Sequence, residues 1–157
     1  PKPFLLGESE LLREGTDVAL VAYGAMSYPA CEAAQTLEAA GISAAVVNAR
    51  FAKPLDEEFL GDCLARFPLV VTVEDHALAG GFGSAVLEMA QRRGWPAGKL
   101  RGLGLPDRFV PHGDRALQLS QLGLDAPGIA RAVQGWRHGG SAPASRPEPL
   151  SREVPVP

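Results

Sequence analysis

Residues 69–93 read LVVTVEDHALAGGFGSAVLEMAQRR and pass from an apolar run, through a glycine-rich loop, into a helical pattern. The run Leu69–Glu74 is apolar almost throughout, which is typical of a strand covered on both faces, as parallel strands usually are. From about Gly83 to Arg93, apolar residues recur at helical spacing. Those expected on the buried face are Val86, Met89 and Ala90. A buried strand followed by an amphipathic helix is one unit of an α/β fold.

The same alternation continues on both sides of this unit. Further strands are predicted at Asp17–Tyr23, at Ala44–Asn48 and, more weakly because glycines interrupt it, at Leu100–Leu105. Further helices are predicted at Tyr28–Ala40, terminated by Gly41, after Pro54 and Asp56, and after Asp125 as a cap. Their expected buried residues are Ala30, Ala33, Ala34, Leu37, Phe59, Leu60, Cys63, Leu64, Ile129, Val133 and Trp136. Right-handed crossovers then predict an α/β fold, with a mostly parallel sheet of about five strands and helices on both faces.

One domain is expected over residues 1–138, and its two ends depart from the alternating pattern. Residues 1–15 contain the apolar Phe4–Leu6 and either add an edge strand or form a linker from an upstream domain. Residues 139–157 are mainly Gly, Ser, Ala and Pro with scattered charges, a composition that predicts a disordered tail. Because the chain begins at Pro1 without a methionine, we expect a fragment or a processed product.

Composition narrows the classes of function. The chain has 157 residues, of which 46% are hydrophobic and 21% charged, with a net charge of −3. It lacks the basic cluster of a nucleic-acid-binding protein, a run long enough to span a membrane, and a secretory signal. Cys31 and Cys63 have neither a CxxC partner nor a nearby histidine, which favours two small buried side chains in a reducing compartment. We therefore expect a cytoplasmic protein.

Three loops follow the predicted strands at the edge where open parallel sheets bind ligands. Residues 23–27, YGAMS, contain one glycine and no cation, which favours a tight turn over an anion cradle. Residues 104–113, GLPDRFVPHG, form a rigid loop in which Arg108 could bind phosphate and His112 could titrate near neutral pH. Alternatively, Asp107 and Arg108 pair with each other or with a partner surface.

The remaining loop, residues 74–84, carries the most information. As a dinucleotide fingerprint it fails, because Val86 occupies the place of the third glycine and the loop lies far from its strand. Glu74, Asp75 and His76 suggest acid–base chemistry. Consecutive residues of an extended segment point in different directions, however, so at least one of the three should have a structural or interface role.

The glycines of this loop predict an interface. Gly80, Gly81 and Gly83 permit close approach of another backbone, and Ser84 could cap the following helix. Phe82 would otherwise be an apolar side chain standing in water, so we expect it to contact an upstream domain or a second subunit. The alternative is that Phe82 folds back onto the core of its own domain.

Five motifs, taken in order, resemble one enzyme family. They are VNARFAKPLD (47–56), VTVEDH (71–76), GGFGS (80–84), GLPDRF (104–109) and LGLDAPGI (122–129). The first three are similar to transketolase-type C-terminal domains in general. The last two, in this order, resemble 1-deoxy-D-xylulose-5-phosphate synthases, and not transketolases or pyruvate dehydrogenase beta subunits. The resemblance covers residues 7–136.

This resemblance implies an enzyme that uses thiamine diphosphate and Mg²⁺ to join pyruvate and D-glyceraldehyde 3-phosphate, forming 1-deoxy-D-xylulose 5-phosphate and CO₂. The product feeds the non-mevalonate isoprenoid route and thiamine synthesis. The family's GDG-to-Asn segment, its activating glutamate and its phosphate-binding arginines belong to upstream domains and are missing here. The resemblance therefore implies no catalytic, cofactor-binding or metal-binding residue in this chain, and no cofactor bound by this domain alone.

What the resemblance implies instead is a domain that packs against the upstream domains and extends a homodimer contact. The interface candidates are Glu74, His76, Gly80, Gly81, Phe82, Gly83 and Arg108. Two other readings remain open at this point. One is a separate regulatory module that binds a phosphate or a nucleotide, and the other is the C-terminal domain of another transketolase-like enzyme.

Overall fold

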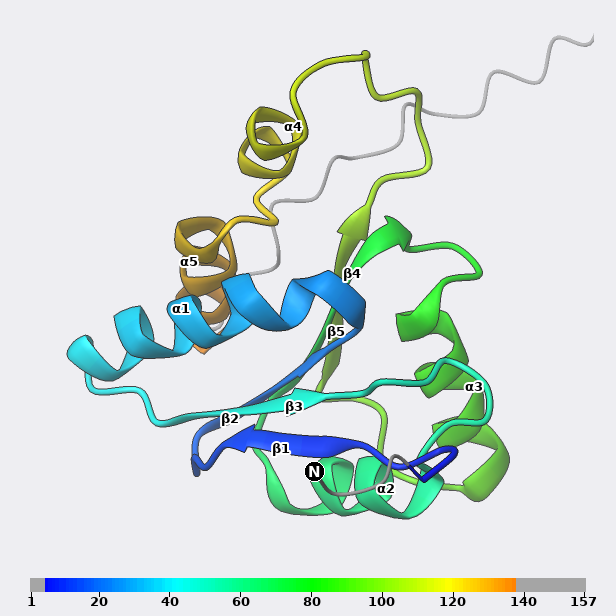
Figure 1. The fold of residues 1–157 in the computed structure, drawn as a ribbon. Helices are drawn as coiled ribbons and strands as arrows, with labels where there is room; N and C mark the ends of the chain where they lie inside the picture. Colours follow the sequence, from blue (N-terminus) through cyan, green and yellow to red (C-terminus); the bar gives the residue numbers. More distant parts are fainter. Residues whose placement is uncertain (1–4, 138–157) are drawn as a thin grey trace, which may run out of the picture.

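A computed structural model describes residues 5–137, which form a five-stranded sheet with helices on both faces (Figure 1). The strands are β1 (Glu10–Arg13), β2 (Val18–Ala22), β3 (Ala44–Asn48), β4 (Val70–Ala77) and β5 (Leu100–Leu105). The helices are the 3₁₀ turn η1 (Gly24–Met26), α1 (Ser27–Ala39), α2 (Glu57–Arg66), α3 (Phe82–Arg93), α4 (Arg115–Gln121) and α5 (Ala126–Arg137). The predicted α/β fold is confirmed.

The strand order is β1-β3-β2-β4-β5, with β2 in the centre. Strands β3, β2, β4 and β5 are mutually parallel, whereas β1 runs antiparallel to β3. All five residues of β2 are fully buried, which is why its sequence, VALVA, is apolar without alternation.

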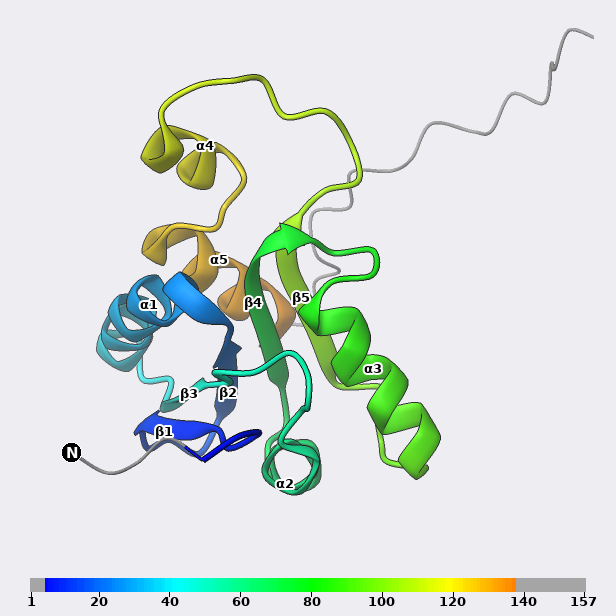
Figure 2. The ribbon, with the colours of Figure 1, turned by 45° about the vertical axis from the view of Figure 1, so that its right-hand side comes forward.

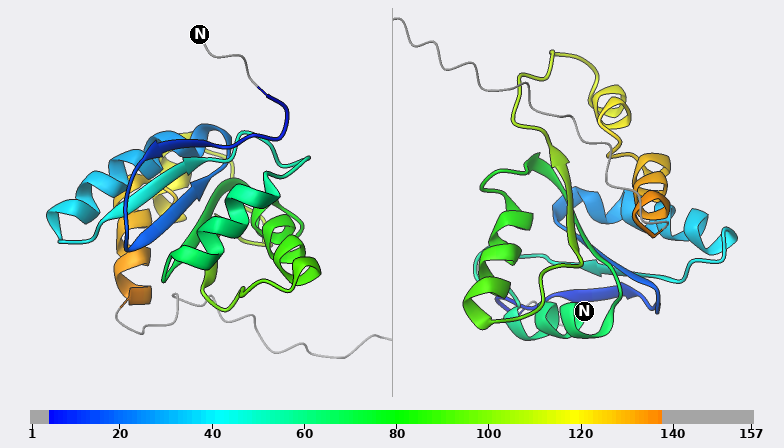
Figure 3. Two further views of the ribbon diagram at one scale, coloured as in Figure 1. Left: turned by 90° about the horizontal axis from the view of Figure 1, so that it is seen from below. Right: turned by 180° about the vertical axis from the view of Figure 1, so that it is seen from behind.

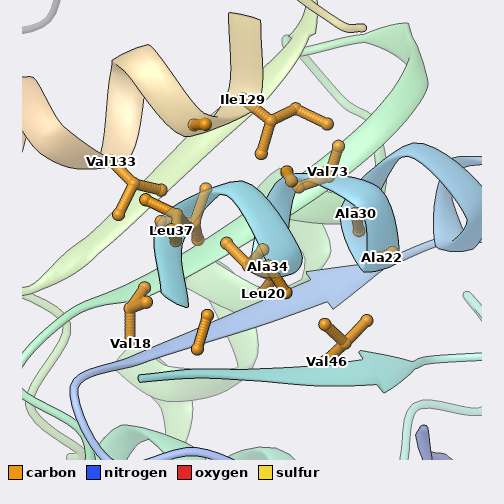
Figure 4. Close-up of a cluster of buried hydrophobic side chains, with 14 of the residues drawn as sticks. Val18, Leu20, Ala22, Ala30, Ala34, Leu37, Val46, Val73, Ile129 and Val133 are labelled. Atoms are coloured by element: carbon orange, nitrogen blue, oxygen red, sulfur yellow. The ribbon is translucent and has the colours of Figure 1, made fainter. Parts of the chain in front are cut away.

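Two hydrophobic cores lie on the two faces of the sheet. Along β2, Val18, Leu20 and Ala22 face α1 and α5, while Ala19 and Val21 face α2 and α3. Figure 4 shows the first core, where Leu37 of α1 meets Val133 of α5 above the sheet. Figure 2 shows α2 and α3 on the opposite side from α1 and α5. The predicted helix faces are buried, although Phe59 and Trp136 are only partly covered.

The outer strand β1 is held to the sheet partly by charge. Arg13 pairs with Glu38 of α1 at 2.5 Å, and Glu10 pairs with Arg50 at 2.6 Å. Just before β1, the backbone N–H of Ser9 donates to Asp56 at 2.7 Å, and the same carboxylate caps α2 by accepting from Phe59. The segment that precedes β2 therefore supplies an edge strand.

The structure differs from the sequence-based prediction in two places. Strand β4 continues to Ala77, so His76 lies in a strand, although the register with β5 shifts between Val73 and Ala77. Helix α4 was not predicted; it is capped by Asp114, whose carboxylate accepts from the N–H of Leu117 at 3.1 Å. The predicted tail, 139–157, falls outside the described residues. Within residues 5–137, no helix is long and apolar enough to cross a membrane.

The two cysteines are free thiols, as their isolation in the sequence suggested. Cys63 is buried among α2, α3 and the sheet, and burial raises the pKa of its thiol to about 11. Cys31 is half-buried, and burial raises its pKa as well. In both cases burial disfavours the thiolate, which is the nucleophilic form of cysteine.

Candidate functional site

The candidate site is a hollow at the carboxyl end of the parallel strands, where ligands of this class of sheet bind. The β4–α3 loop (Leu78–Gly81) forms one wall, and Tyr23, the residue after β2, forms another. The hollow has a volume of about 470 Å³, and Glu74 and His76 also line it. Five of the seven predicted interface residues, Glu74, His76, Gly80, Gly81 and Phe82, thus meet in one place.

Glu74 is fully buried and holds the N-terminus of α3. One carboxylate oxygen accepts from the backbone N–H of Phe82 at 2.6 Å, and the other accepts from Gly83 at 2.8 Å. A helix leaves its first N–H groups without intrahelical partners, and a carboxylate there also interacts favourably with the helix dipole. Glu74 is therefore a helix cap supplied by a neighbouring strand, and its oxygens are occupied by the fold.

The glycines of this segment serve the same cap. A Cβ atom on Gly81 would lie 2.3 Å from Glu74 Oε2 and from the carbonyl oxygen of Ala77. A Cβ atom on Gly83 would lie 2.5 Å from Thr72 Oγ1 and 3.2 Å from Glu74 Oε1. The close approach predicted for Gly81 and Gly83 is therefore to their own domain. Gly80 has no neighbour within 4 Å of an added Cβ, and its φ of +75° is what favours glycine.

One prediction for this loop is wrong. Ser84 does not cap α3, because its hydroxyl donates to the carbonyl of Leu78 at 2.6 Å and accepts from the N–H of Gly80 at 3.1 Å. For Phe82, the structure shows the arrangement given as the alternative: its ring is only 3% exposed and packs in the domain's own core between the sheet, α2 and α3.

Three rings extend from this core to the surface. Phe82 stacks on Tyr23 with ring centres 5.3 Å apart, and Tyr23 contacts His76 at 5.8 Å with tilted planes. The His76 side chain is 61% exposed, so the row ends at the surface with a group that can donate or accept hydrogen bonds. Among the predicted residues that line this hollow, His76 has an exposed polar side chain that can contact a partner.

The side chains of Glu74, Asp75 and His76 diverge, as strand geometry predicted. Glu74 points inward to α3, and His76 contacts Tyr23. Asp75 accepts from Arg115 of α4 at 2.5 Å, with His76 Nδ1 3.6 Å away. The three residues therefore form no acid–base constellation around a common point.

The loop after β2 is the tight turn that its sequence favoured. Gly24 has a φ of +63°, and Ser27 donates to the Gly24 carbonyl at 3.0 Å. This closes η1 directly onto α1.

The β5–α4 loop (Pro106–Asp114) carries Arg108 to a separate place. Arg108 lines a groove beside β5 and α5, not the hollow around His76. Across residues 5–137, no ion pair joins Arg108 to Asp107 or to another acidic side chain. Phe109, next to Arg108, is 97% exposed. Sequence reasoning singled out Arg108 but not Phe109, although a phenylalanine between charged and turn residues in a loop is itself a signal of exposure.

Comparison with known proteins identifies the family of this chain. The family described as "Transketolase, C-terminal domain" matches residues 7–129. The chain belongs to the transketolase C-terminal domain family. As a member of that family, it is 46% identical over 139 residues to 1-deoxy-D-xylulose-5-phosphate synthase 1 of Geobacter sulfurreducens, covering 88% of this chain and 22% of that protein. It is 50% identical to the synthase of Anaeromyxobacter sp. over 139 residues, covering 85% of this chain and 22% of that protein. The sequence resemblance to these synthases is confirmed.

Solved structures show the same transketolase C-terminal fold. A split-gene transketolase, described as an inactive beta4 tetramer, superimposes with a TM-score of 0.76 at 39% identity, covering 83% of this chain and 42% of that chain. Transketolase from Campylobacter jejuni superimposes with a TM-score of 0.61 at 17% identity, covering 82% and 18%, which shows the fold alone. This transketolase C-terminal domain spans about a fifth of the length of the curated relatives it matches.

Two observations on the described residues bear on whether they could hold thiamine diphosphate and Mg²⁺. Residues 5–137 contain no group of three or more His, Cys, Asp or Glu side chains placed to hold a metal ion. A diphosphate could otherwise bind N–H groups at the start of α3, but Glu74 accepts from two of them. Because Glu74 accepts from these two N–H groups, they are not available to bind a phosphate or a nucleotide in the glycine loop.

Proposed function

We propose that this chain is the C-terminal domain of a 1-deoxy-D-xylulose-5-phosphate synthase. That enzyme would use thiamine diphosphate and Mg²⁺ to condense pyruvate with D-glyceraldehyde 3-phosphate, with loss of CO₂, in the cytoplasm. The observation that carries the proposal is the 46–51% identity to curated synthases over stretches of 108–139 residues. Fold similarity alone would not carry it, since transketolase at 17% identity has the same fold.

Within that enzyme, the role we assign to this domain is packing against upstream domains and extending a homodimer contact. Two acidic groups at the end of β4, Glu74 and Asp75, are committed to internal bonds. What it offers outward is apolar or mixed surface, including Tyr28 at 78% exposure, Leu11 at 46% and Leu12 at 41%. Exposed apolar groups of this kind mark protein–protein contacts when they are contiguous.

A domain exchange tests the assignment. The segment of the Geobacter sulfurreducens synthase that matches this chain is replaced by residues 7–137 of this chain. We expect the chimera to form 1-deoxy-D-xylulose 5-phosphate at a rate within about tenfold of the parent, because in the proposal the two domains, which are 46% identical, share their assembly surfaces. The matched control receives the corresponding domain of Campylobacter jejuni transketolase, which has the fold without the surface. A chimera that assembles but is as inactive as this control would refute the assignment.

Cofactor binding gives a second test. The isolated 157-residue chain is titrated calorimetrically with thiamine diphosphate and Mg²⁺, and the active chimera serves as the positive control. We expect heat of binding from the chimera only, because the cofactor's binding groups lie outside this domain in the proposal. Micromolar binding to the isolated chain would contradict the proposed division of labour.

A further inference from the structure

Strand β5 pairs with another strand on one side only; at its start, the N–H of Leu100 donates to the carbonyl of Ala97 and the carbonyl of Leu100 accepts from the Arg101 side chain. Its neighbour in the sheet is β4, and no described strand lies beyond it. In the right-hand view of Figure 3, the yellow-green β5 runs between the green α3 and the orange α5. An open strand edge presents unpaired N–H and C=O groups, which proteins usually protect with a proline, a lysine or a covering segment.

Two of the residues in the middle of β5, Gly102 and Gly104, have no side chain. An added Cβ atom on either would come within about 3 Å of Leu78, so Leu78 covers this face of the strand in their place. The outward N–H and C=O groups of the two glycines therefore have no bulky side chain of their own residue beside them. An incoming backbone can therefore approach β5 directly.

A groove follows the same edge. Its volume is about 620 Å³, and its walls come from Leu78 on one side and from α5 on the other. The apolar part of its lining includes Leu103, Leu122 and Trp136. The groove thus brings backbone of β5 and apolar side chains to one place.

The groove also carries unneutralised positive charge. Arg108 and Arg131 both line it, and among residues 5–137 neither makes an ion pair. Arg13, Arg92 and Arg115 of the same domain do pair with carboxylates. Two arginines in one groove favour a carboxylate-bearing ligand and disfavour a second copy of the same groove, because like charges would then meet.

We propose that the β5 edge binds an extended, acidic peptide segment of a partner protein. The segment would add a sixth strand to the sheet, pair its backbone with β5, and place carboxylates near Arg108 and Arg131. Its alternate side chains would be apolar and contact Leu78 or Trp136. Strand addition of this kind takes affinity from main-chain hydrogen bonds and specificity from alternate side chains. The proposal goes beyond the proposed function and does not depend on it.

Direct binding tests the charge preference. The probe is a fluorescein-labelled peptide, Glu-Val repeated three times with blocked ends, which matches the six residues of β5. Its fluorescence anisotropy is measured with the 157-residue chain. We expect saturable binding that weakens at least about tenfold for the Arg108→Ala/Arg131→Ala variant and for a Lys-Val peptide. The matched control is Arg66→Ala, which removes an exposed arginine of α2 and should leave affinity unchanged.

Backbone pairing needs its own test, since two arginines could attract any acidic molecule. Strand addition uses the N–H groups of alternate peptide residues, so N-methylation of one alternate set should abolish binding while methylation of the other set preserves it. In a Trp95→Phe variant, Trp136 is the remaining tryptophan of the chain, and its emission should shift on binding.

Three outcomes would overturn the proposal. The first is absence of saturable binding at millimolar peptide. The second is equal binding of the Lys-Val peptide or of both methylated peptides. The third is self-association of the chain that the arginine substitutions abolish, because this would assign the groove to a second copy. Circular dichroism melting of each variant confirms that it is folded, and the chimera's activity, which tests the proposed function, is read separately.

Discussion

Two loops leave the same edge of the sheet, and they use their residues in opposite ways. In the β4–α3 loop and the first turn of α3, the polar groups bond within the domain. Glu74 accepts from the N–H of Phe82, whose ring is buried, and Ser84 bonds to the backbone of Gly80 and of the preceding loop. In the β5–α4 loop, Phe109 is exposed and Arg108 has no ion pair within the described chain. The first loop carries a glycine-rich motif that looks like a ligand site, whereas the second overlaps the family motif GLPDRF and has no glycine-rich cradle.

The difference shows that a motif and an available surface are separate properties. Glycines are required wherever a backbone approaches something closely, and in the β4–α3 loop that something is the domain's own glutamate. The groups left over after folding are the ones that can bind a partner. Stability measurements on matched substitutions in the two loops test this difference.

The two phenylalanines should give the largest difference. Phe82→Ala should lower the free energy of unfolding by about 3–5 kcal/mol, because it removes a buried ring and leaves a cavity. Phe109→Ala should change it by less than about 0.5 kcal/mol, since its ring is solvated. Urea unfolding of both variants measures this. Similar losses for the two would mean that Phe109 is packed as well.

Removal of the buried charge at the helix start should come next. Glu74→Gln should cost about 2–3 kcal/mol, because one of two charge-assisted hydrogen bonds to α3 is lost and an N–H group then faces a donor. Glu88→Gln, on the exposed side of α3, is the control and should be neutral. An equally small effect at Glu74 would show that the cap contributes little.

Glycine substitutions in the two loops should give a smaller difference in stability. Gly83→Ala should destabilise by about 1–3 kcal/mol, because the new Cβ would meet Thr72 Oγ1 at 2.5 Å, even though alanine is the better helix former. Thr72→Ala in the same chain should recover part of the loss. Gly113→Ala, where nothing lies within 4 Å, should be neutral or slightly stabilising. Thermal melting of the three variants decides between crowding and a general intolerance of side chains.

The smallest effect should come from the ion pair between β4 and α4. Asp75→Asn removes the bond to Arg115 and should cost about 0.5 kcal/mol at low salt, because Arg115 is largely exposed. The cost should disappear in concentrated NaCl, where such pairs are screened. A salt-independent loss would instead indicate that Asp75 holds α4 in place by packing.

Most of the fold could be predicted from sequence, because buried parallel strands and amphipathic helices leave clear periodic patterns. Ala44–Asn48 and Leu100–Leu105 were predicted with the bounds that the structure shows. Helix α4 was missed since its seven residues complete barely two turns, too few for a period to appear. Because successive side chains of a strand point to opposite faces, the sequence also predicted that the side chains of Glu74, Asp75 and His76 would point in different directions.

The candidate site was harder to predict than the fold. Sequence placed Glu74 and Phe82 at an interface, yet both are internal. A helix capped from a strand eight positions earlier depends on how the intervening loop bends, and no local propensity records that bend. Arg108 was singled out as a charge in a rigid loop, but the groove that it lines also needs α5 beside β5, which lies far away in sequence.

The cap on α3 also bears on the order in which the chain folds. Glu74 and Phe82 are eight positions apart, so their contact closes a short loop, whereas the pairing of β4 with β2 joins Val70 to Ala19. Short loops close in tens of nanoseconds, while pairing of distant strands is slow. The strand end and the first turn of α3 can therefore form together as an early local unit. In that case Glu74→Gln would slow refolding more than it speeds unfolding.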